Sequence, residues 1–198
     1  MTVNIKLRFL LLAGLVLYVA TAAADKALFA GGCFWCMESD FEKLPGVTDV
    51  ISGFTGGTLK NPIYNGNHTG HYESIEVTYD PRQVSYRQLL DYYWVHIDPF
   101  DPQGQFCDKG HSYMTAIFVA NAGERKLAEA SLQKVAARFP NQQVTTRILD
   151  ATTFYPIKGK EGYHQDYYKK NPVRYKFYRY SCGRDQRLTE IWGNEATH

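Results

Sequence analysis

The hydrophobic positions of the chain follow two spacings, which predict strands and helices respectively. Ile75, Val77 and Tyr79 alternate with polar residues, as in a strand that is buried on one face. Leu132, Val135 and Phe139 recur every three to four residues, as on one side of a helix. Such patterns predict strands at residues 26–30, 47–55, 73–79, 113–120 and 144–149. They predict helices at residues 33–43, 85–96 and 122–139, and a helical, Tyr-rich stretch from residue 160.

Turn and capping residues mark where these elements end. Pro45-Gly46 ends the first helix, and Ser85 with Gln88 forms a capping-box pattern at the start of the second. Residues 61–70 and 98–110 have the composition of loops. Strands and helices that mix without strict alternation predict a two-layer α+β domain. From about residue 173 we expect a mostly irregular C-terminal tail.

The N-terminal residues have the order of a secretory signal peptide. Lys6 and Arg8 precede an apolar run at 9–20, and alanines at 22–24 supply a small-residue cleavage pattern. The run is shorter than the roughly 20 apolar residues of a membrane-spanning helix, although an uncleaved anchor is an alternative. We expect a signal peptide at 1–24 and one folded domain at 25–198. The mature protein is then exported to the periplasm or the cell exterior without stable membrane insertion.

The charge balance excludes a general attraction to polyanions. The chain has 22 basic and 20 acidic residues, so we expect no nucleic-acid partner. Residues 169–179 interleave basic and aromatic side chains, which can indicate single-stranded nucleic-acid binding. In a nearly neutral chain with a signal peptide, we interpret this segment as part of a solvated tail.

Four cysteines, Cys33, Cys36, Cys107 and Cys182, follow the signal peptide. Cys33 and Cys36 are within one helical turn, so a disulfide between them would close a very small loop and stabilise the fold little. This spacing favours redox chemistry. Because Cys107 and Cys182 are solitary, the second close pair of a structural zinc site is missing, and we expect no metal.

The segment Gly31-Gly32-Cys33 places a cysteine between a strand and a helix. The unpaired N–H groups at a helix N-terminus favour an anion. We therefore expect a lowered pKa for the Cys33 thiol and a reactive thiolate. Cys36 is one turn further on the same face, where it can reach the Cys33 sulfur.

Six motifs in order make the chain similar to the type A methionine sulfoxide reductases. The resemblance extends from Ala27 to about Pro172. The motifs are Gly-Cys-Phe-Trp at 32–35, Gly-Phe-Thr-Gly-Gly at 53–57, Asn-Pro-x-Tyr at 61–64, Gly-His-x-Glu at 70–73, Asp-x-Gly-x-x-Tyr at 108–113 and Tyr-His-Gln at 163–165. The resemblance implies a ferredoxin-like α/β plait core. It also implies reduction of methionine S-sulfoxide, protein-bound or free, to methionine.

The resemblance further implies a role for each matching residue. Cys33 attacks the sulfoxide sulfur and becomes a sulfenic acid. Glu73 donates a proton to the sulfoxide oxygen, which requires a raised pKa and a partly buried position. Tyr64 and Tyr113 donate hydrogen bonds to that oxygen.

The substrate-binding residues follow from the same motifs. Phe34 and Trp35 form an apolar cage for the substrate methyl group, and Asp108 orients the site. We expect a monomer that needs no metal or organic cofactor. Its electrons come from an external thiol reductant such as a thioredoxin-like protein.

The cysteine that forms the intramolecular disulfide is left open by the sequence. Cys36 is favoured as first resolver by its proximity, with Cys182 passing the oxidation to the surface through a mobile tail; Cys182 as first resolver is the alternative. We assign Cys107 no catalytic step.

Two other functions compete with the reductase. One is a general exported thiol-disulfide oxidoreductase that uses Cys33 and Cys36. The other is a disulfide-stapled exported binding module in which all four cysteines are paired.

Overall fold

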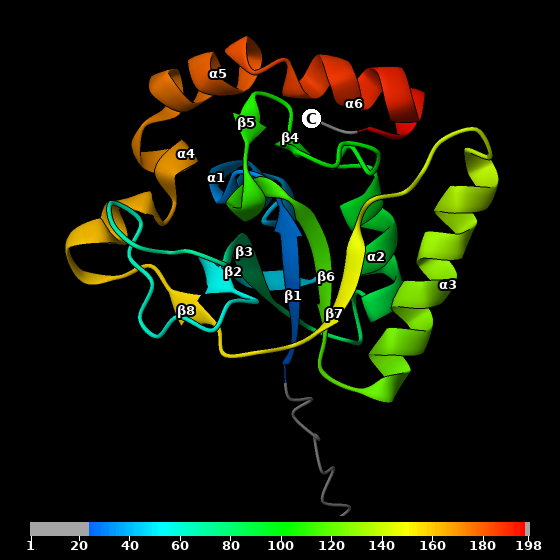
Figure 1. Cartoon of the computed structure of the whole chain (residues 1–198), viewed down its shortest axis with the longest axis horizontal. Coiled ribbons are helices and arrows are strands. Elements are labelled where there is room, and N and C mark those ends of the chain that lie inside the picture. The colour runs from blue at the N-terminus through cyan, green and yellow to red at the C-terminus, as the bar shows by residue number, and fades with distance from the viewer. Residues whose placement is uncertain (1–23, 197–198) are drawn as a thin grey trace, which may run out of the picture.

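The computed structural model describes residues 24–196, which form a mixed sheet covered by helices (Figure 1). The sheet has six strands in the order β7-β6-β1-β3-β2-β8. Their bounds are β1 Asp25–Gly31, β2 Val47–Thr55, β3 Tyr72–Tyr79, β6 Thr115–Val119, β7 Arg147–Asp150 and β8 Tyr155–Pro156. A separate hairpin pairs β4 Gly104–Gln105 with β5 Asp108–Lys109.

The centre of this sheet confirms the predicted plait. Along the chain, β1, α1 (Phe34–Phe41), β2, β3, α2 (Tyr86–Trp94) and β6 follow one another. In space β1 is between β3 and β6, and β3 is beside β2, with every pair antiparallel. This is the order of a ferredoxin-like fold, extended by β7 parallel to β6 and by β8 antiparallel to β2. The α+β class expected from the sequence is therefore confirmed.

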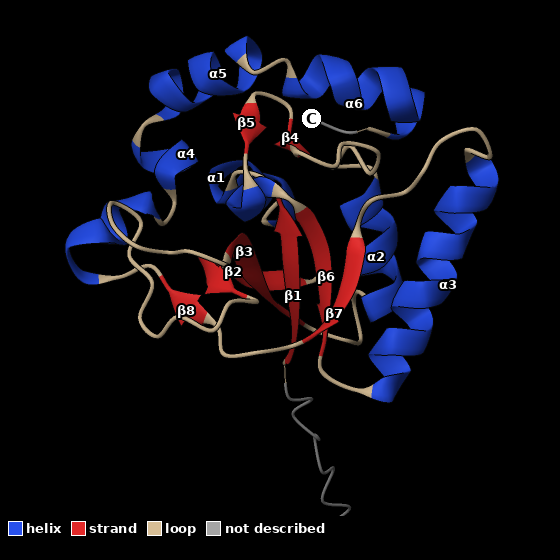
Figure 2. Ribbon diagram, viewed as in Figure 1, coloured by secondary structure: helices blue, strands red, loops and turns tan. Residues whose placement is uncertain are grey.

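Helices α1, α2 and α3 (Ala122–Arg138) pack beside the sheet (Figure 2). The alternating residues of β3 behave as predicted, since Ile75 and Val77 are fully buried in the core. The capping box of Ser85 and Gln88 is present at α2. The predicted strand at 113–120 is wrong at its start, because residues His111–Tyr113 form a 3-10 helix and β6 begins at Thr115.

The expected irregular tail is wrong. After a 3-10 turn at Gly159–His164 and α4 (Tyr167–Lys170), the chain forms α5 (Pro172–Ser181), α6 (Arg184–Trp192) and a 3-10 turn at Gly193–Glu195. Figure 1 shows α5 and α6 running across one end of the sheet. Arg179 donates to Asp40 Oδ1 on α1 at 2.8 Å, and Arg184 donates to the His96 carbonyl at 2.7 Å. Buried contacts of Arg179 and Arg184 therefore order the C-terminal segment, which its sequence predicts to be a solvated, irregular tail.

None of the helices within residues 24–196 has the length and apolar character needed to cross a bilayer. Apart from Ala24, the signal peptide predicted at 1–24 is outside the described residues.

Asp40 is the buried anion on which the tail depends. Its side chain is completely buried, and Arg179 and Arg184 both approach it. We expect Asp40→Asn to lower the free energy of unfolding by about 3–5 kcal/mol, because the buried Arg184 loses the counter-charge of Asp40 and the buried Arg179 keeps only its ion pair with the half-buried Asp185. Urea denaturation measures this. Asp49→Asn, at an exposed position, is the matched control with an expected change under about 0.5 kcal/mol; equal losses in both variants would contradict the role of Asp40.

Candidate active site

Cys33 is at the junction that the sequence predicts. β1 ends at Gly31, and Cys33 is the N-cap of α1, where its carbonyl accepts from the Cys36 amide at 3.1 Å. Gly32 between them has φ +80°, and a Cβ there would lie 2.5 Å from the Gln105 Cβ. Glycine at this position therefore permits both the left-handed backbone and the close approach of Gln105.

Glu73 reaches this junction from β3. Its Oε2 accepts a hydrogen bond from the backbone N–H of Phe34 at 3.2 Å, and its side chain is buried. Burial raises the pKa of Glu73 to about 8 despite that hydrogen bond. The carboxyl therefore carries a proton at neutral pH, as a proton donor must. The predicted burial and raised pKa are confirmed.

Two tyrosine hydroxyls lie near the same carboxyl. Tyr113 is within hydrogen-bonding reach of Glu73, and Tyr64 is close enough to Glu73, Tyr113 and Cys33 to be influenced by their charges. Burial raises the pKa of both phenols. Each is thus a protonated donor at neutral pH, and the structure brings four predicted residues from separate segments together.

The two aromatic residues after Cys33 differ in how deeply they are buried. The Phe34 ring is buried in the main core, 5.7 Å from the Tyr64 ring. Trp35 is half-buried; its indole stacks on Tyr167 at 3.9 Å, and its N–H donates to His164 Nδ1 at 3.0 Å. Trp35 is therefore the more accessible of the two predicted cage residues.

The two thiols at the site form a coupled pair. Cys33 and Cys36 are both free and buried. Burial and the hydrogen bond with Cys36 raise the pKa of Cys33, whereas the hydrogen bond from Cys33 and the positive charges of Arg184 and Arg179 lower the pKa of Cys36 to about 7. The prediction of a lowered pKa at Cys33 is wrong for this closed site, because desolvation outweighs the favourable helix N-terminus.

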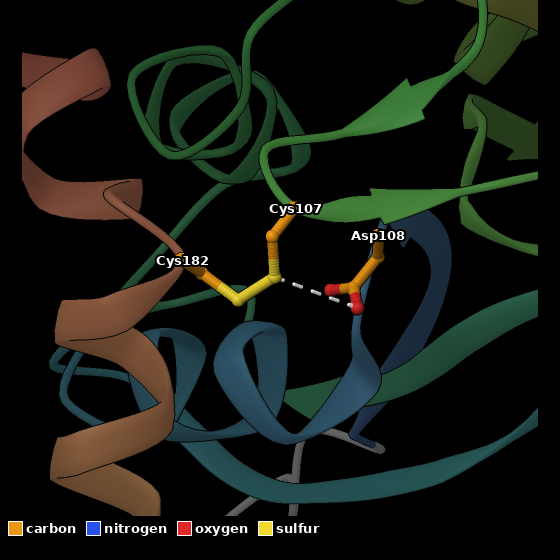
Figure 3. A group of neighbouring side chains, drawn as sticks. All are labelled: Cys107, Asp108 and Cys182. Carbon is orange, nitrogen blue, oxygen red and sulfur yellow. Dashed lines mark hydrogen bonds between the residues drawn. A yellow bond between two sulfur atoms is a disulfide. The ribbon is translucent and has the colours of Figure 1, made fainter.

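Cys182 is not in a mobile tail but in a disulfide with Cys107 (Figure 3). Cys182 caps the C-terminus of α5, while Cys107 precedes β5 in an exposed position. The bond joins residues 75 positions apart and links the tail to the β4–β5 hairpin. The binding-module alternative expected all four cysteines to be paired, and two of them are free.

Asp108 and Tyr178 complete the site from the hairpin and from α5. The Tyr178 hydroxyl donates to Asp108 Oδ2, and burial raises the pKa of Asp108. The Tyr178 side chain also packs against the cluster that contains Cys33 and Cys36, and it lowers the pKa of Cys33 against the larger effect of burial. Tyr178 was missed in the sequence because its segment was expected to be irregular; its three-residue spacing from Tyr175 was the available signal.

Residues 25–196 match a model of the peptide methionine sulfoxide reductase family. The chain is 49% identical to the peptide methionine sulfoxide reductase MsrA/MsrB of Vibrio cholerae over 90% of its own length and 48% of the relative, about half of that longer protein. It is 49% identical to MsrA 2 of Caulobacter vibrioides over 88% of this chain and 89% of the relative. The solved methionine sulfoxide reductase A of Corynebacterium diphtheriae is similar with a TM-score of 0.65 and 33% identity, over 76% of each chain.

Proposed function

Because the chain belongs to the peptide methionine sulfoxide reductase family, we propose that Cys33 is the nucleophile with which it reduces methionine sulfoxide. The chain is an oxidoreductase of the MsrA type. The observation that carries the assignment to Cys33 is the buried Glu73 carboxyl, which accepts from the first amide of α1, directly after Cys33 in the chain. A general thiol-disulfide exchange would not require this carboxyl.

The first step transfers the oxygen. The Cys33 sulfur attacks the sulfoxide sulfur, Glu73 protonates the sulfoxide oxygen, and the hydroxyls of Tyr64 and Tyr113 donate to that oxygen as negative charge develops. The S–O bond of the substrate then breaks. The hydroxyl moves to the Cys33 sulfur, which becomes a sulfenic acid, and the transient bond between the two sulfurs breaks as methionine leaves with the electron pair of that bond.

The second step forms a disulfide. We assign it first to Cys36, whose thiol is in hydrogen-bond contact with Cys33 and has a pKa of about 7. Attack of the Cys36 thiolate on the sulfenic sulfur forms the Cys33–Cys36 bond and releases the oxygen as water. Cys182 can take part only after its own bond to Cys107 has been reduced, which favours Cys36 as the first resolver.

Cys36→Ser tests this assignment. We expect the variant to form one equivalent of methionine per chain and then to recycle at least about tenfold more slowly, because its sulfenic acid lacks the adjacent thiol. Rapid-quench analysis of methionine formed in the first turnover and at steady state measures both rates. Cys182→Ser is the matched control. Full-speed recycling in Cys36→Ser together with loss of recycling in Cys182→Ser would make Cys182 the first resolver.

Recycling requires an external dithiol. We propose a thioredoxin-like protein as the donor, since the exposed Cys107 offers it an accessible sulfur while Cys33 and Cys36 are buried. A donor thiolate attacks Cys107 in the Cys107–Cys182 disulfide, and the second donor thiol releases the mixed disulfide, so that Cys107 and Cys182 become thiols and the donor is oxidised. The Cys182 thiolate then attacks the Cys33–Cys36 disulfide, and Cys107 resolves the resulting bond, which restores Cys107–Cys182 and leaves Cys33 and Cys36 as thiols. Every proposed step uses thiols, one carboxyl and two phenols, so this thiol donor is the only co-reactant that we propose.

We further propose that the protein acts outside the cytoplasm as a monomer. The positive, apolar and small-residue order of residues 1–24 supports export. Cleavage after Ala24 would leave the whole of β1, which begins at Asp25. All of the site residues come from one chain, so a second copy is not needed to complete the site.

The proposed function is tested by turnover of a racemic methionine sulfoxide derivative by the full chain with dithiothreitol. We expect half of the material to be consumed, with the R form left, because the proposed substrate is the S-sulfoxide. Peptide-bound and free methionine sulfoxide are compared in parallel. No consumption by a protein with two free thiols would instead favour a general thiol-disulfide oxidoreductase.

A further inference from the structure

The Tyr178 hydroxyl lies between Asp108 and the two site thiols. It donates to the Asp108 carboxylate, and the Tyr178 side chain packs against the cluster that contains Cys33 and Cys36, close enough for Tyr178 and Cys33 to shift each other's pKa. A phenol carries one proton and accepts with its oxygen. It can therefore donate to Asp108 while Cys33 is a thiol, and turn its proton toward Cys33 when that sulfur becomes a thiolate.

The ring of Tyr178 is held for this position rather than left in solvent. It is half-buried and contacts Trp35 edge-on, with ring centroids 5.7 Å apart. Tyr180, two residues later on α5, is 85% exposed. The helix therefore presents Tyr178 to the site and Tyr180 to water, which provides a matched comparison.

The Cys107–Cys182 disulfide closes a ring around this contact. Cys107 is the neighbour of Asp108 in sequence, and the Cys182 amide donates to the Tyr178 carbonyl at 2.9 Å across one helical turn. Figure 3 shows the disulfide beside the Asp108 carboxylate, with the Cys107 sulfur 3.8 Å from Asp108 Oδ1. The disulfide thus joins the β4–β5 hairpin to α5 one residue from Asp108 and one helical turn from Tyr178, the two residues of the hydrogen bond.

We propose that Tyr178 is a third hydroxyl donor of the site, which acts on the Cys33 sulfur and stabilises its thiolate, and that the Cys107–Cys182 disulfide is a positioning clamp for Tyr178. This inference rests on the proposed role of Cys33 as nucleophile. The hydroxyl assists the sulfur before attack, whereas Tyr64 and Tyr113 are assigned to the sulfoxide oxygen. Reduction of the clamp to two thiols frees the end of α5 and weakens the assistance, so the redox state of an exposed disulfide sets the reactivity of a buried thiol.

Several other groups influence the ionisation of Cys33, and the test must separate them from Tyr178. They are Cys36 on α1, Glu73 on β3, Tyr64 in the loop before β3, and Tyr113 in the turn after the β4–β5 hairpin. Asp108 on β5 acts on Cys33 only through its hydrogen bond with Tyr178. Of these, Cys36 is the strongest partner and titrates as a pair with Cys33. A Cys36→Ser background removes that coupling and leaves Cys33 as the single free thiol while the clamp is intact.

The test compares the rate of Cys33 modification by methyl methanethiosulfonate across a pH series, in the full chain carrying Cys36→Ser. We expect Tyr178→Phe to move the profile upward by about one pH unit, because a hydrogen bond to the thiolate is lost while the ring remains. At a fixed pH below the midpoint, the rate should fall about tenfold. Tyr180→Phe should leave the profile unchanged. An unchanged profile in Tyr178→Phe would overturn the proposal.

The clamp is tested with Cys107→Ser/Cys182→Ser in the same background. We expect a shift in the same direction as that of Tyr178→Phe, and no additional shift when the changes are combined, because both act through one hydroxyl. Additive shifts, or no shift without the disulfide, would remove the clamp from the proposal. Cooperative unfolding in urea shows whether the double variant is folded. If it is not, the Cys107–Cys182 disulfide is opened instead in the Cys36→Ser chain with dithiothreitol, which is itself oxidised. Mass spectrometry of the peptide that contains Cys33 then separates modification of Cys33 from that of the two new thiols.

These measurements do not use methionine sulfoxide. If the pH profile of Cys33 modification does not shift in these variants, that result therefore counts only against the roles of Tyr178 and the disulfide, and not against the proposed reductase function. Loss of the proposed function would appear separately, as sulfoxide turnover that persists without Cys33.

Discussion

Cys33→Ser is expected to abolish methionine formation, with a loss of at least about 10⁴-fold relative to the unchanged chain. A serine hydroxyl is hardly ionised at neutral pH, and its oxygen cannot accept the sulfoxide oxygen to form a sulfenic acid. The substitution is small and lies at an N-cap position where serine is well tolerated. We therefore expect the fold to be unchanged.

Single-turnover analysis gives the sharpest comparison for this variant. Cys33→Ser should form no methionine, whereas Cys36→Ser should form one equivalent, although both lose one thiol of the same pair. Far-ultraviolet circular dichroism checks that both variants are folded. One equivalent of methionine from Cys33→Ser would transfer the nucleophilic role to Cys36 and refute the proposed order of the two thiols.

Glu73→Gln is expected to slow oxygen transfer by about 10²- to 10⁴-fold, the usual contribution of a positioned general acid. The amide has nearly the same shape, and its carbonyl can still accept from the Phe34 N–H, but it cannot protonate the sulfoxide oxygen. Glu76→Gln is a matched control, because Glu76 is on the same strand and pairs with the exposed Lys26. We expect the control to retain its full rate.

The pH dependence identifies the proton donor. The pKa of Glu73 is raised to about 8, so the proton is present below that pH and is lost as the pH rises through it. Thiol ionisation acts in the opposite direction, and above pH 8 the ionised Glu73 also raises the pKa of Cys33 in the unchanged chain, an effect that Glu73→Gln removes. The deficit of Glu73→Gln relative to the unchanged chain should therefore shrink above pH 8. A deficit that stays constant from pH 6 to pH 9.5 would mean that another group donates the proton.

The sheet could be predicted because its core is built from local apolar patterns. Ile75 and Val77 alternate as a half-buried strand should, and both are fully buried. The tail could not be predicted this way, because its order depends on Arg179 and Arg184 meeting Asp40, about 140 residues earlier in the chain. Buried ion pairs between distant segments leave no periodic hydrophobic signal.

The site could be predicted only in part, because motifs identify its residues whereas contacts between distant segments determine their burial and bonding. The family motifs identified Glu73, Tyr64 and Tyr113, which the structure brings to Cys33. The pKa direction of Cys33 was wrong, because a helix N-terminus can be read from the sequence but burial beneath later segments cannot. The Cys107–Cys182 bond was missed for the same reason, since neither cysteine has a close partner in sequence.

The burial of the two site thiols also bears on how long one enzyme molecule survives among oxidants. Cys33 is 6% exposed and Cys36 is 2% exposed. A second oxidation of the sulfenic acid, to the irreversible sulfinic acid, requires a peroxide to reach the same sulfur. The enclosing residues slow that approach, while the neighbouring thiol converts the intermediate quickly. We therefore expect the closed site to allow many catalytic cycles before Cys33 is irreversibly inactivated.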